Sequence, residues 1–195
     1  MGQQATILIV CTGNICRSPF IERLLQRRLD ERRPASEQAI RVGSAGTGAL
    51  AGWAMDERAA AQLVAYGGDP ALFSARHLTP DLIAASDLVL TATRSHRGGV
   101  SAMCPKALRR VFTFADFADL VAGVDGLNAR VANRDPREWV AHVTEEAATN
   151  RGLNPPLDAA QADIVDPFGR PDAVFTAMAQ QVVASMPSVV RALAG

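Results

Sequence analysis

The chain has 195 residues with 20 basic and 20 acidic side chains, so its formal net charge at pH 7 is zero. This balance does not indicate a basic face for nucleic acid, and we expect no apolar run long enough to span a membrane. The length suits a single domain over 1–195 with a hydrophobic core.

The number of cysteines and the N-terminal residues both favour a reducing, cytoplasmic location. The three cysteines are Cys11, Cys16 and Cys104, an odd and sparse set that favours a reducing environment over a disulfide scaffold. The first residues lack a charged segment followed by an apolar stretch, so we expect no secretory signal and a cytoplasmic location.

The first predicted elements alternate between strand and helix. The apolar run 7–10 predicts a buried strand, and 19–33 predicts an amphipathic helix with proline in its first turn. A second strand is expected over 39–42. A helix over 56–66 is expected to end at the glycine pair 67–68.

The later elements continue this alternation. Thr79 and Pro80 open a short helix, and strands are predicted over 87–92 and 111–114. The terminal helix spans 172–193, where Pro187 is expected to produce a kink. The whole pattern favours a parallel sheet with helices on both faces.

A helical insertion is expected around 116–163. The segment 135–143 reads as the start of a helix, and 151–156 as a turn or loop. We expect one or two extra helices packed on the edge of the core, as a structural elaboration in preference to a substrate lid or a dimer surface.

The loop that follows the first strand carries the strongest chemical signal. It reads Cys11-Thr12-Gly13-Asn14-Ile15-Cys16-Arg17-Ser18-Pro19. A cysteine near a helix N-terminus and an arginine favours the thiolate, which is the nucleophilic form. Arg17 can hold two oxygens of an oxyanion, and the loop N–H groups and the helix dipole add favourable potential. A buried structural cysteine is the alternative, and the complete string favours the functional interpretation.

Other residue types in this loop have their own reasons. Gly13 is expected to supply a backbone conformation that other residues resist. Asn14 also tolerates the left-handed region and can hydrogen-bond the loop to itself. The Ser18 hydroxyl can donate to the sulfur. Cys16 either traps oxidised Cys11 as a disulfide or is a small buried thiol.

This string resembles the phosphate loop of the low-molecular-weight protein tyrosine phosphatases. Two further segments are similar to landmarks of that family: Ser44-Ala45-Gly46-Thr47-Gly48 after the second strand and Asp166-Pro167-Phe168 before the final helix. The resemblance implies an α/β, flavodoxin-like three-layer fold with a four-stranded parallel sheet of order 2-1-3-4. The extra helices would lie between the last strand and the Asp166 loop.

The resemblance also implies a two-step mechanism. Cys11 would attack phosphorus to form a cysteinyl-phosphate, while Arg17 and the loop N–H groups hold the phosphate oxygens. Asp166 would protonate the leaving phenolate and then activate water. A turn residue is the alternative for Asp166. No metal or other cofactor is required.

Further site residues follow from the same resemblance. Ser44 would support Asn14, and Phe168 would offer an aromatic face. Leu50 or Trp53 would form a wall of the cleft, with a place in the core as the alternative for Trp53. Where the family often pairs a histidine with an aspartate, this chain has Phe73 and Thr93. The candidate substrate-binding residues are Thr12, Gly13, Asn14, Ile15, Cys16, Ser18, Ser44, Leu50, Trp53 and Phe168.

The function expected from these residues is hydrolysis of phosphotyrosine in proteins, with a bacterial tyrosine kinase as one candidate substrate, by a monomer or weak dimer. Phosphate or a similar oxyanion would bind in the loop. The alternative is arsenate reduction with a thiol co-substrate. An internal disulfide cascade would need two further cysteines, and Cys104 alone lies outside the loop. A silent phosphotyrosine-binding module is disfavoured, because binding alone needs no thiolate.

Overall fold

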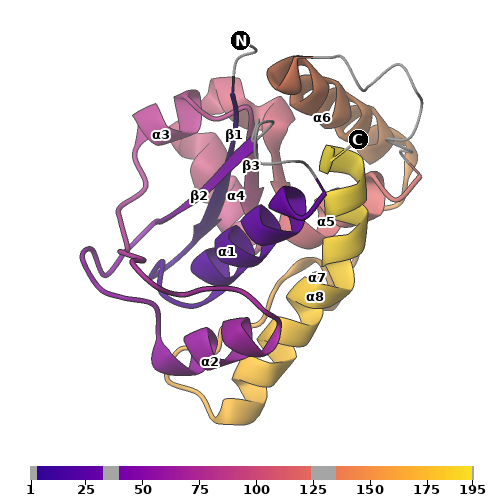
Figure 1. Ribbon diagram of the computed structural model, residues 1–195. Coiled ribbons are helices and arrows are strands. Elements are labelled where there is room, and N and C mark those ends of the chain that lie inside the picture. Colours follow the sequence, from indigo (N-terminus) through magenta and orange to yellow (C-terminus); the bar gives the residue numbers. More distant parts are fainter. Residues whose placement is uncertain (1–3, 33–39, 124–134, 195) are drawn as a thin grey trace.

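A four-stranded parallel sheet in the order β2-β1-β3-β4 forms the centre of the molecule (Figure 1). The computed structural model describes residues 4–32, 40–123 and 135–194. The strands are β1 (Ala5–Cys11), β2 (Ile40–Gly46), β3 (Leu88–Thr91) and β4 (Val111–Thr113). The predicted flavodoxin-like sheet order is therefore confirmed.

The central strand β1 is buried on both faces, as expected of a parallel strand covered by helices. Successive side chains of a strand point to opposite faces. Ile7 and Ile9 accordingly join one hydrophobic cluster, whereas Leu8 and Val10 join a second cluster on the other face. The sheet thus separates two cores.

The larger core lies under α1 (Arg17–Asp30), α2 (Glu57–Ala65), α5 (Phe114–Leu120) and α8 (Asp172–Ala194). In Figure 1, α8 runs in front of the sheet beside α1 and reaches α2 at its lower end. The apolar face of α1 is buried: Phe20, Ile21, Leu24, Leu25 and Leu29. Its hydrophobic spacing produces this packing.

The smaller core lies under α3 (Pro80–Ala84), α4 (Arg94–Met103) and the 3₁₀ helix η2 (Pro105–Arg110). The Thr79 side chain caps α3, as its sequence predicts. Helix α4 was not predicted, because Gly98 and Gly99 have low helix propensity. Its N-terminus is stabilised by the Thr93 side chain, and Val100 anchors it in the core.

Several element boundaries differ from the prediction. Helix α1 begins at Arg17, two residues before Pro19, because Cys16 already occupies the N-cap position. It ends at Asp30, and the predicted end at Arg33 lies outside the described residues, as does Ala39 at the start of the second predicted strand. Strand β2 extends to Gly46, where it pairs with Cys11 of β1.

The expectation that no apolar segment could span a membrane was wrong for α8. By length and composition, this helix alone among the described residues could cross a bilayer, with a mean hydropathy of 1.3. Its buried side chains, including Phe175, Met178 and Val182, belong to the larger core. The helix continues through Pro187 to Ala194.

The segment 116–163, where extra helices are expected, holds most of α5, α6 (Pro136–Leu153) and the short α7 (Ala159–Ala162). Arg137 Nε donates to Asp87 Oδ1 at 2.7 Å, just before β3, and Arg151 Nη2 donates to the carbonyl of Val111 at 2.6 Å. Both contacts lie at the amino ends of strands, whereas Cys11 ends β1. Helix α6 therefore packs away from the Cys11 loop and does not form a lid over it. The loop predicted over 151–156 is helical as far as Leu153.

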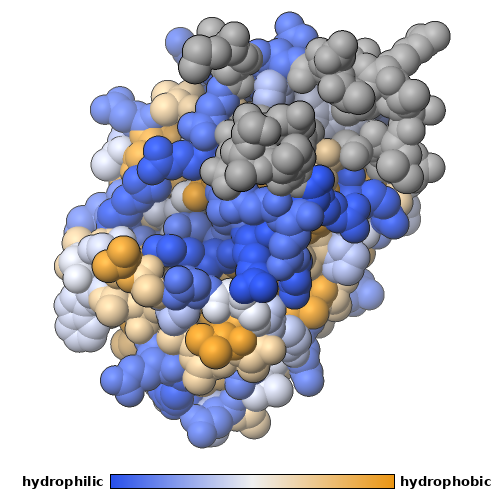
Figure 2. All heavy atoms as spheres, viewed as in Figure 1, coloured by the Kyte–Doolittle hydropathy of each residue, from blue (hydrophilic) through white to orange (hydrophobic). Residues whose placement is uncertain are grey.

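The surface in the view of Figure 1 is largely hydrophilic. Figure 2 shows hydrophobic residues there in small separate groups. Where the described residues form this face, they present no extended apolar patch of the kind that marks a stable interface.

We expect Trp139→Ala to lower the free energy of unfolding by about 3–5 kcal/mol, the usual cost of removing a large buried aromatic side chain. Trp139 is 4% exposed, and its Nε1–H donates to the carbonyl of Ala192 at 3.1 Å, which ties α6 to α8. Chemical denaturation measures the change. The control Leu153→Ala, at a side chain 75% exposed on the same helix, should stay within about 0.5 kcal/mol. A loss below about 1 kcal/mol for Trp139→Ala would show that the insertion is not part of the core.

Candidate active site

The loop from Cys11 to Arg17 points its carbonyl groups outward. The carbonyls of Cys11, Thr12 and Gly13 accept from the amides of Thr47, Gly48 and Leu50 at 2.9–3.0 Å. The carbonyl of Ile15 accepts from Asp56 N–H at 2.9 Å. Because C=O and N–H lie on opposite sides of a trans peptide, this docking turns the following amides inward.

The inward amides form a cradle for an oxyanion. Among the described residues, the amides of Gly13, Ile15 and Cys16 have no protein acceptor. They lie next to the N-terminus of α1, which starts at Arg17 and adds the positive end of its dipole. The loop can therefore bind a tetrahedral anion with backbone groups alone.

Asn14, and not Gly13, takes the left-handed backbone conformation in this loop. Its φ is 55°, whereas Gly13 is not among the residues with positive φ. The prediction for Gly13 was therefore wrong. The glycine that space requires is Gly46, where an added Cβ would lie 2.3 Å from the carbonyl oxygen of Thr12.

The Asn14 side chain is fully buried and connects three elements. Its Nδ2 donates to Ser18 Oγ at 2.9 Å and to Ser44 Oγ at 2.7 Å. Its Oδ1 accepts from the backbone N–H of Arg76 at 2.8 Å. The hydrogen bond to Ser44 that the resemblance implies is thus present.

A mostly buried carboxylate, Glu22, completes this network. Ser44 Oγ–H donates to Glu22 Oε2 at 2.5 Å. Burial raises the pKa of Glu22, while the hydrogen bond from Ser44 and the charges of Arg23, Arg76 and Arg41 act in the opposite direction. The network thus runs from Glu22 through Ser44, Asn14 and Ser18 to Cys11.

Cys11 Sγ is surrounded by hydrogen-bonding groups. It lies 2.9 Å from Ser18 Oγ and accepts from the Asn14 N–H at 3.3 Å. Both groups can stabilise negative charge on the sulfur, as a nucleophile or as a leaving group. The hydroxyl contact expected for Ser18 is present.

Cys16 has a different environment from Cys11 in the same loop. Burial, followed by the negative charges of Asp56, Cys11 and Asp166, raises the pKa of the Cys16 thiol to about 12, against a smaller lowering by Arg17. Cys16 therefore remains a neutral thiol and does not compete with Cys11 as a nucleophile.

Arg17 and Asp166 face each other at the mouth of the site. Arg17 is 5% exposed, and its Nη2 donates to Asp166 Oδ2 at 2.6 Å. Asp166 Oδ1 accepts from the Phe168 N–H at 3.2 Å. This hydrogen bond closes a turn over residues 166–168 and fixes the orientation of the Asp166 carboxylate. Asp166 is accordingly both a turn residue and a polar group at the site.

A hollow of about 190 Å³ brings most of the predicted residues together. Arg17 and Asp166 give it charge, and Ile15, Leu50 and Phe168 give it apolar walls. Trp53 does not line it and is 61% exposed, so the proposed wall is Leu50. Asn14, Ser18 and Ser44 lie beneath the loop and support it. The full lining is Cys11, Thr12, Gly13, Ile15, Cys16, Arg17, Gly48, Leu50, Asp166 and Phe168.

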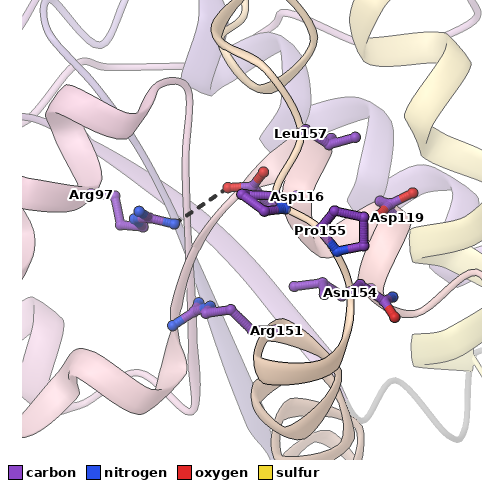
Figure 3. A pocket seen from close by; sticks show the side chains of 9 residues that line it. Arg97, Asp116, Asp119, Arg151, Asn154, Pro155 and Leu157 are labelled. Carbon is purple, nitrogen blue, oxygen red and sulfur yellow. Dashed lines mark hydrogen bonds and ion pairs between the residues drawn. The ribbon is translucent and has the colours of Figure 1, made fainter.

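A second hollow, of about 50 Å³, lies beside α4, α5 and the end of α6 (Figure 3). Arg97 and Asp116 point toward each other there and are 3.4 Å apart. The Arg151 guanidinium lies 3.9 Å from the centre of the Phe112 ring. These charged groups hold neighbouring elements together, and the lining contains no cysteine. Across the described residues, no group of three or more acidic, histidine or cysteine side chains could hold a metal ion.

Comparison with known proteins identifies the family of the chain. The family model described as "Low molecular weight phosphotyrosine protein phosphatase" matches residues 6–127, which is more than half of the chain. The chain belongs to this family.

Two similar proteins show the extent of the relationship. The probable low molecular weight protein-tyrosine-phosphatase AmsI of Erwinia amylovora is 34% identical over 143 residues, covering 73% of this chain and 92% of AmsI. The crystal structure of AmsI has a TM-score of 0.66 at 25% identity and covers 100% of this chain and 95% of that one. The YwlE arginine phosphatase from Geobacillus stearothermophilus has a TM-score of 0.65 at 26% identity, covering 95% of this chain and 90% of that one.

Two positions at which the resemblance implies other residues make contacts near the Cys11 loop. The Arg23 guanidinium lies 5.7 Å from the centre of the Phe73 ring. The Thr93 side chain caps α4 and contacts His96 Nδ1 at 2.7 Å. Phe73 therefore contributes packing and Thr93 contributes a helix cap, and the two side chains do not form a charged pair with each other.

Sequence reasoning missed four residues of the site: Glu22, Gly48, Arg76 and His96. Glu22 had a usable signal, since it lies four residues after Ser18 and so on the same side of α1. His96, whose Nε2 is 2.9 Å from Thr12 Oγ1, had none, because 84 positions separate the two residues.

We expect Glu22→Gln to become more stable relative to the wild type as pH rises. Glu22 is protonated in both states below its unfolded pKa of about 4.3, so burial then carries no ionisation cost. Above that pH the raised folded pKa makes ionisation costly in the native state, by about 1.4 kcal/mol per unit, until the folded pKa is passed. Denaturation from pH 4 to pH 8 measures the difference. The control for loss of one charge is Glu146→Gln, at an exposed position of α6. A difference that does not change with pH would contradict this expectation.

We expect peroxide to inactivate the wild type reversibly through a Cys11–Cys16 disulfide. Oxidation of Cys11 to a sulfenic acid lets the Cys16 thiol displace water and form the bond. Cys16→Ser should keep most activity but recover less when a dithiol is added, whereas Cys104→Ser should recover fully. Peptide mass spectrometry that finds no such disulfide in oxidised wild type would refute the idea.

Proposed function

We propose that this chain is a bacterial protein tyrosine phosphatase that works through a cysteinyl-phosphate intermediate. The observation that carries the proposal is one hollow that holds the Cys11 sulfur, the Arg17 guanidinium and the Asp166 carboxyl within apolar walls. The expected substrates are phosphotyrosine proteins of the cytoplasm, with a bacterial tyrosine kinase among them.

The first step transfers the phosphoryl group. The Cys11 thiolate attacks phosphorus, the bond from phosphorus to the phenolic oxygen breaks, and Asp166 gives its proton to that oxygen. Arg17 and the inward amides hold the other phosphate oxygens as charge shifts between them. The loop is already shaped for this anion by its contacts with residues 47–56.

The second step restores the enzyme. Asp166, now ionised, accepts a proton from water, and the water oxygen attacks the phosphorus of the cysteinyl-phosphate. The bond from sulfur to phosphorus breaks, inorganic phosphate leaves, and Cys11 returns as the thiolate. Ser18 Oγ, 2.9 Å from the sulfur, supports this leaving group.

The walls of the hollow favour an aryl ester. Ile15, Leu50 and Phe168 present apolar surface beside the phosphate site. A phenyl ring buries well against such groups, and Phe168 adds an aromatic face. A charged guanidinium would lose hydration there, so we expect phosphotyrosine to be preferred over phosphoarginine.

Arsenate reduction through an internal relay has little support. Cys104 is the C-cap of α4 and is absent from the lining of the hollow. Cys104→Ser should therefore leave hydrolysis of an aryl phosphate within a small factor of wild type.

We expect Asp166→Asn to slow turnover of phosphotyrosine by about 100-fold to 10,000-fold, the usual worth of positioned acid catalysis. The loss should be smaller for phosphoryl transfer from a nitrophenyl ester, whose leaving group needs little protonation. Cys11→Ser should abolish turnover of both esters, because it removes the nucleophile. Single-turnover kinetics on esters of graded leaving-group acidity measure the trend.

Cys104→Ser is the matched control for these variants. A uniform loss across the ester series for Asp166→Asn, or no loss, would show that Asp166 acts only in the turn. A wild type that does not hydrolyse aryl phosphates would refute the proposed function.

A further inference from the structure

One histidine outside the predicted site contacts the phosphate-binding loop. His96 lies in the first turn of α4, and its Nε2 is 2.9 Å from Thr12 Oγ1. Its Nδ1 is 2.7 Å from Thr93 Oγ1, which also accepts from the His96 backbone N–H at 3.3 Å. The imidazole therefore connects α4, which packs on the smaller core, to the loop that carries Cys11.

Arg17 favours one arrangement of the hydrogens in this chain of contacts. Arg17 Nη2 lies 3.5 Å from Thr12 Oγ1 and, as a guanidinium nitrogen, can only donate. The Thr12 oxygen is then an acceptor for Arg17, and its single hydrogen can point to His96 Nε2. This arrangement requires Nε2 without a proton and Nδ1–H donating to Thr93, which is the neutral Nδ1–H tautomer.

The charges around His96 favour the same state. Burial lowers the pKa of His96, and the positive charge of Arg17 lowers it further, while the carboxylates of Asp166 and Asp163 oppose this. Arg94 and Arg97 flank it on its own helix. A protonated imidazole would direct two cationic donors, His96 and Arg17, at the one Thr12 oxygen.

We propose that His96 is a positioning residue for the phosphate-binding loop, because its Nε2 accepts the Thr12 hydroxyl hydrogen and so orients the Thr12 oxygen toward Arg17. This inference rests on the proposed phosphatase function of the loop. Arg17 Nη2 is then held between Thr12 Oγ1 and Asp166 Oδ2. Its remaining donors are fixed in direction before an oxyanion arrives, which lowers the ordering cost of binding.

Two substitutions of similar size separate the two contacts of the imidazole. The amide of His96→Asn reaches the Nδ1 position and keeps a partner for Thr93, but it does not reach Thr12. The amide of His96→Gln reaches the Nε2 position and can accept from Thr12. If positioning is the role, His96→Asn weakens binding of inorganic phosphate about tenfold, the effect of losing one hydrogen bond, and His96→Gln restores most of the affinity.

Isothermal titration with inorganic phosphate measures these affinities without turnover. The control Ser95→Ala, at an exposed position in the same helical turn, should bind phosphate within about twofold of wild type. Equal phosphate affinity for His96→Asn and wild type would overturn the proposal. Equal losses for His96→Asn and His96→Gln would also overturn it.

Nitrogen NMR of the wild-type imidazole is a second test, and it needs no variant to fold. The expected signature at neutral pH is the Nδ1–H tautomer of neutral His96, with Nε2 as the acceptor. The Nε2–H tautomer, or a charged ring, would overturn the proposal. Both readouts are independent of turnover, so a protein that passes them and leaves phosphotyrosine intact refutes the proposed function alone.

Discussion

The geometry of the site depends on the buried side chain of Asn14. Its left-handed backbone turns the loop, and its amide holds Ser18 of α1, Ser44 of β2 and the Arg76 N–H at the same time. A buried amide that lost one of these partners would leave a polar group unsatisfied. The inward direction of the loop amides is therefore built into the fold before any anion binds, which is the condition for electrostatic preorganisation.

Environment divides the roles of two thiols in one loop. Cys11 faces Ser18 and an inward amide, so negative charge on its sulfur is stabilised by hydrogen bonds. Cys16, five residues later, is buried, and burial together with the negative charges of Asp56, Cys11 and Asp166 raises the pKa of its thiol to about 12. The loop thus holds one sulfur suited to act as the nucleophile and one that stays a neutral thiol, because charge and burial differ over a few ångströms.

Features encoded by short stretches of sequence were predicted better than features that depend on contacts between distant residues. The Cys11 loop and the cap at Thr79 follow from adjacent residues, and the sheet order followed from resemblance to a family. Helix α4 was missed because its stability comes from a cap and from the burial of Val100, against the low propensity of its glycines. Trp53 was misplaced because the path of an exposed loop depends on tertiary contacts that no local pattern encodes.

Thr93 shows how one side chain can favour the charge state of its neighbour. An aspartate here would place a carboxylate beside the imidazole of His96 and favour its charged form. Threonine caps α4 and accepts from the Nδ1–H of the neutral ring, so the series Thr93, His96, Thr12 adds no net charge next to Arg17. Phe73 likewise removes a titratable group, and Arg23 packs over its ring. The charged side chains that line the hollow are therefore Arg17 and Asp166.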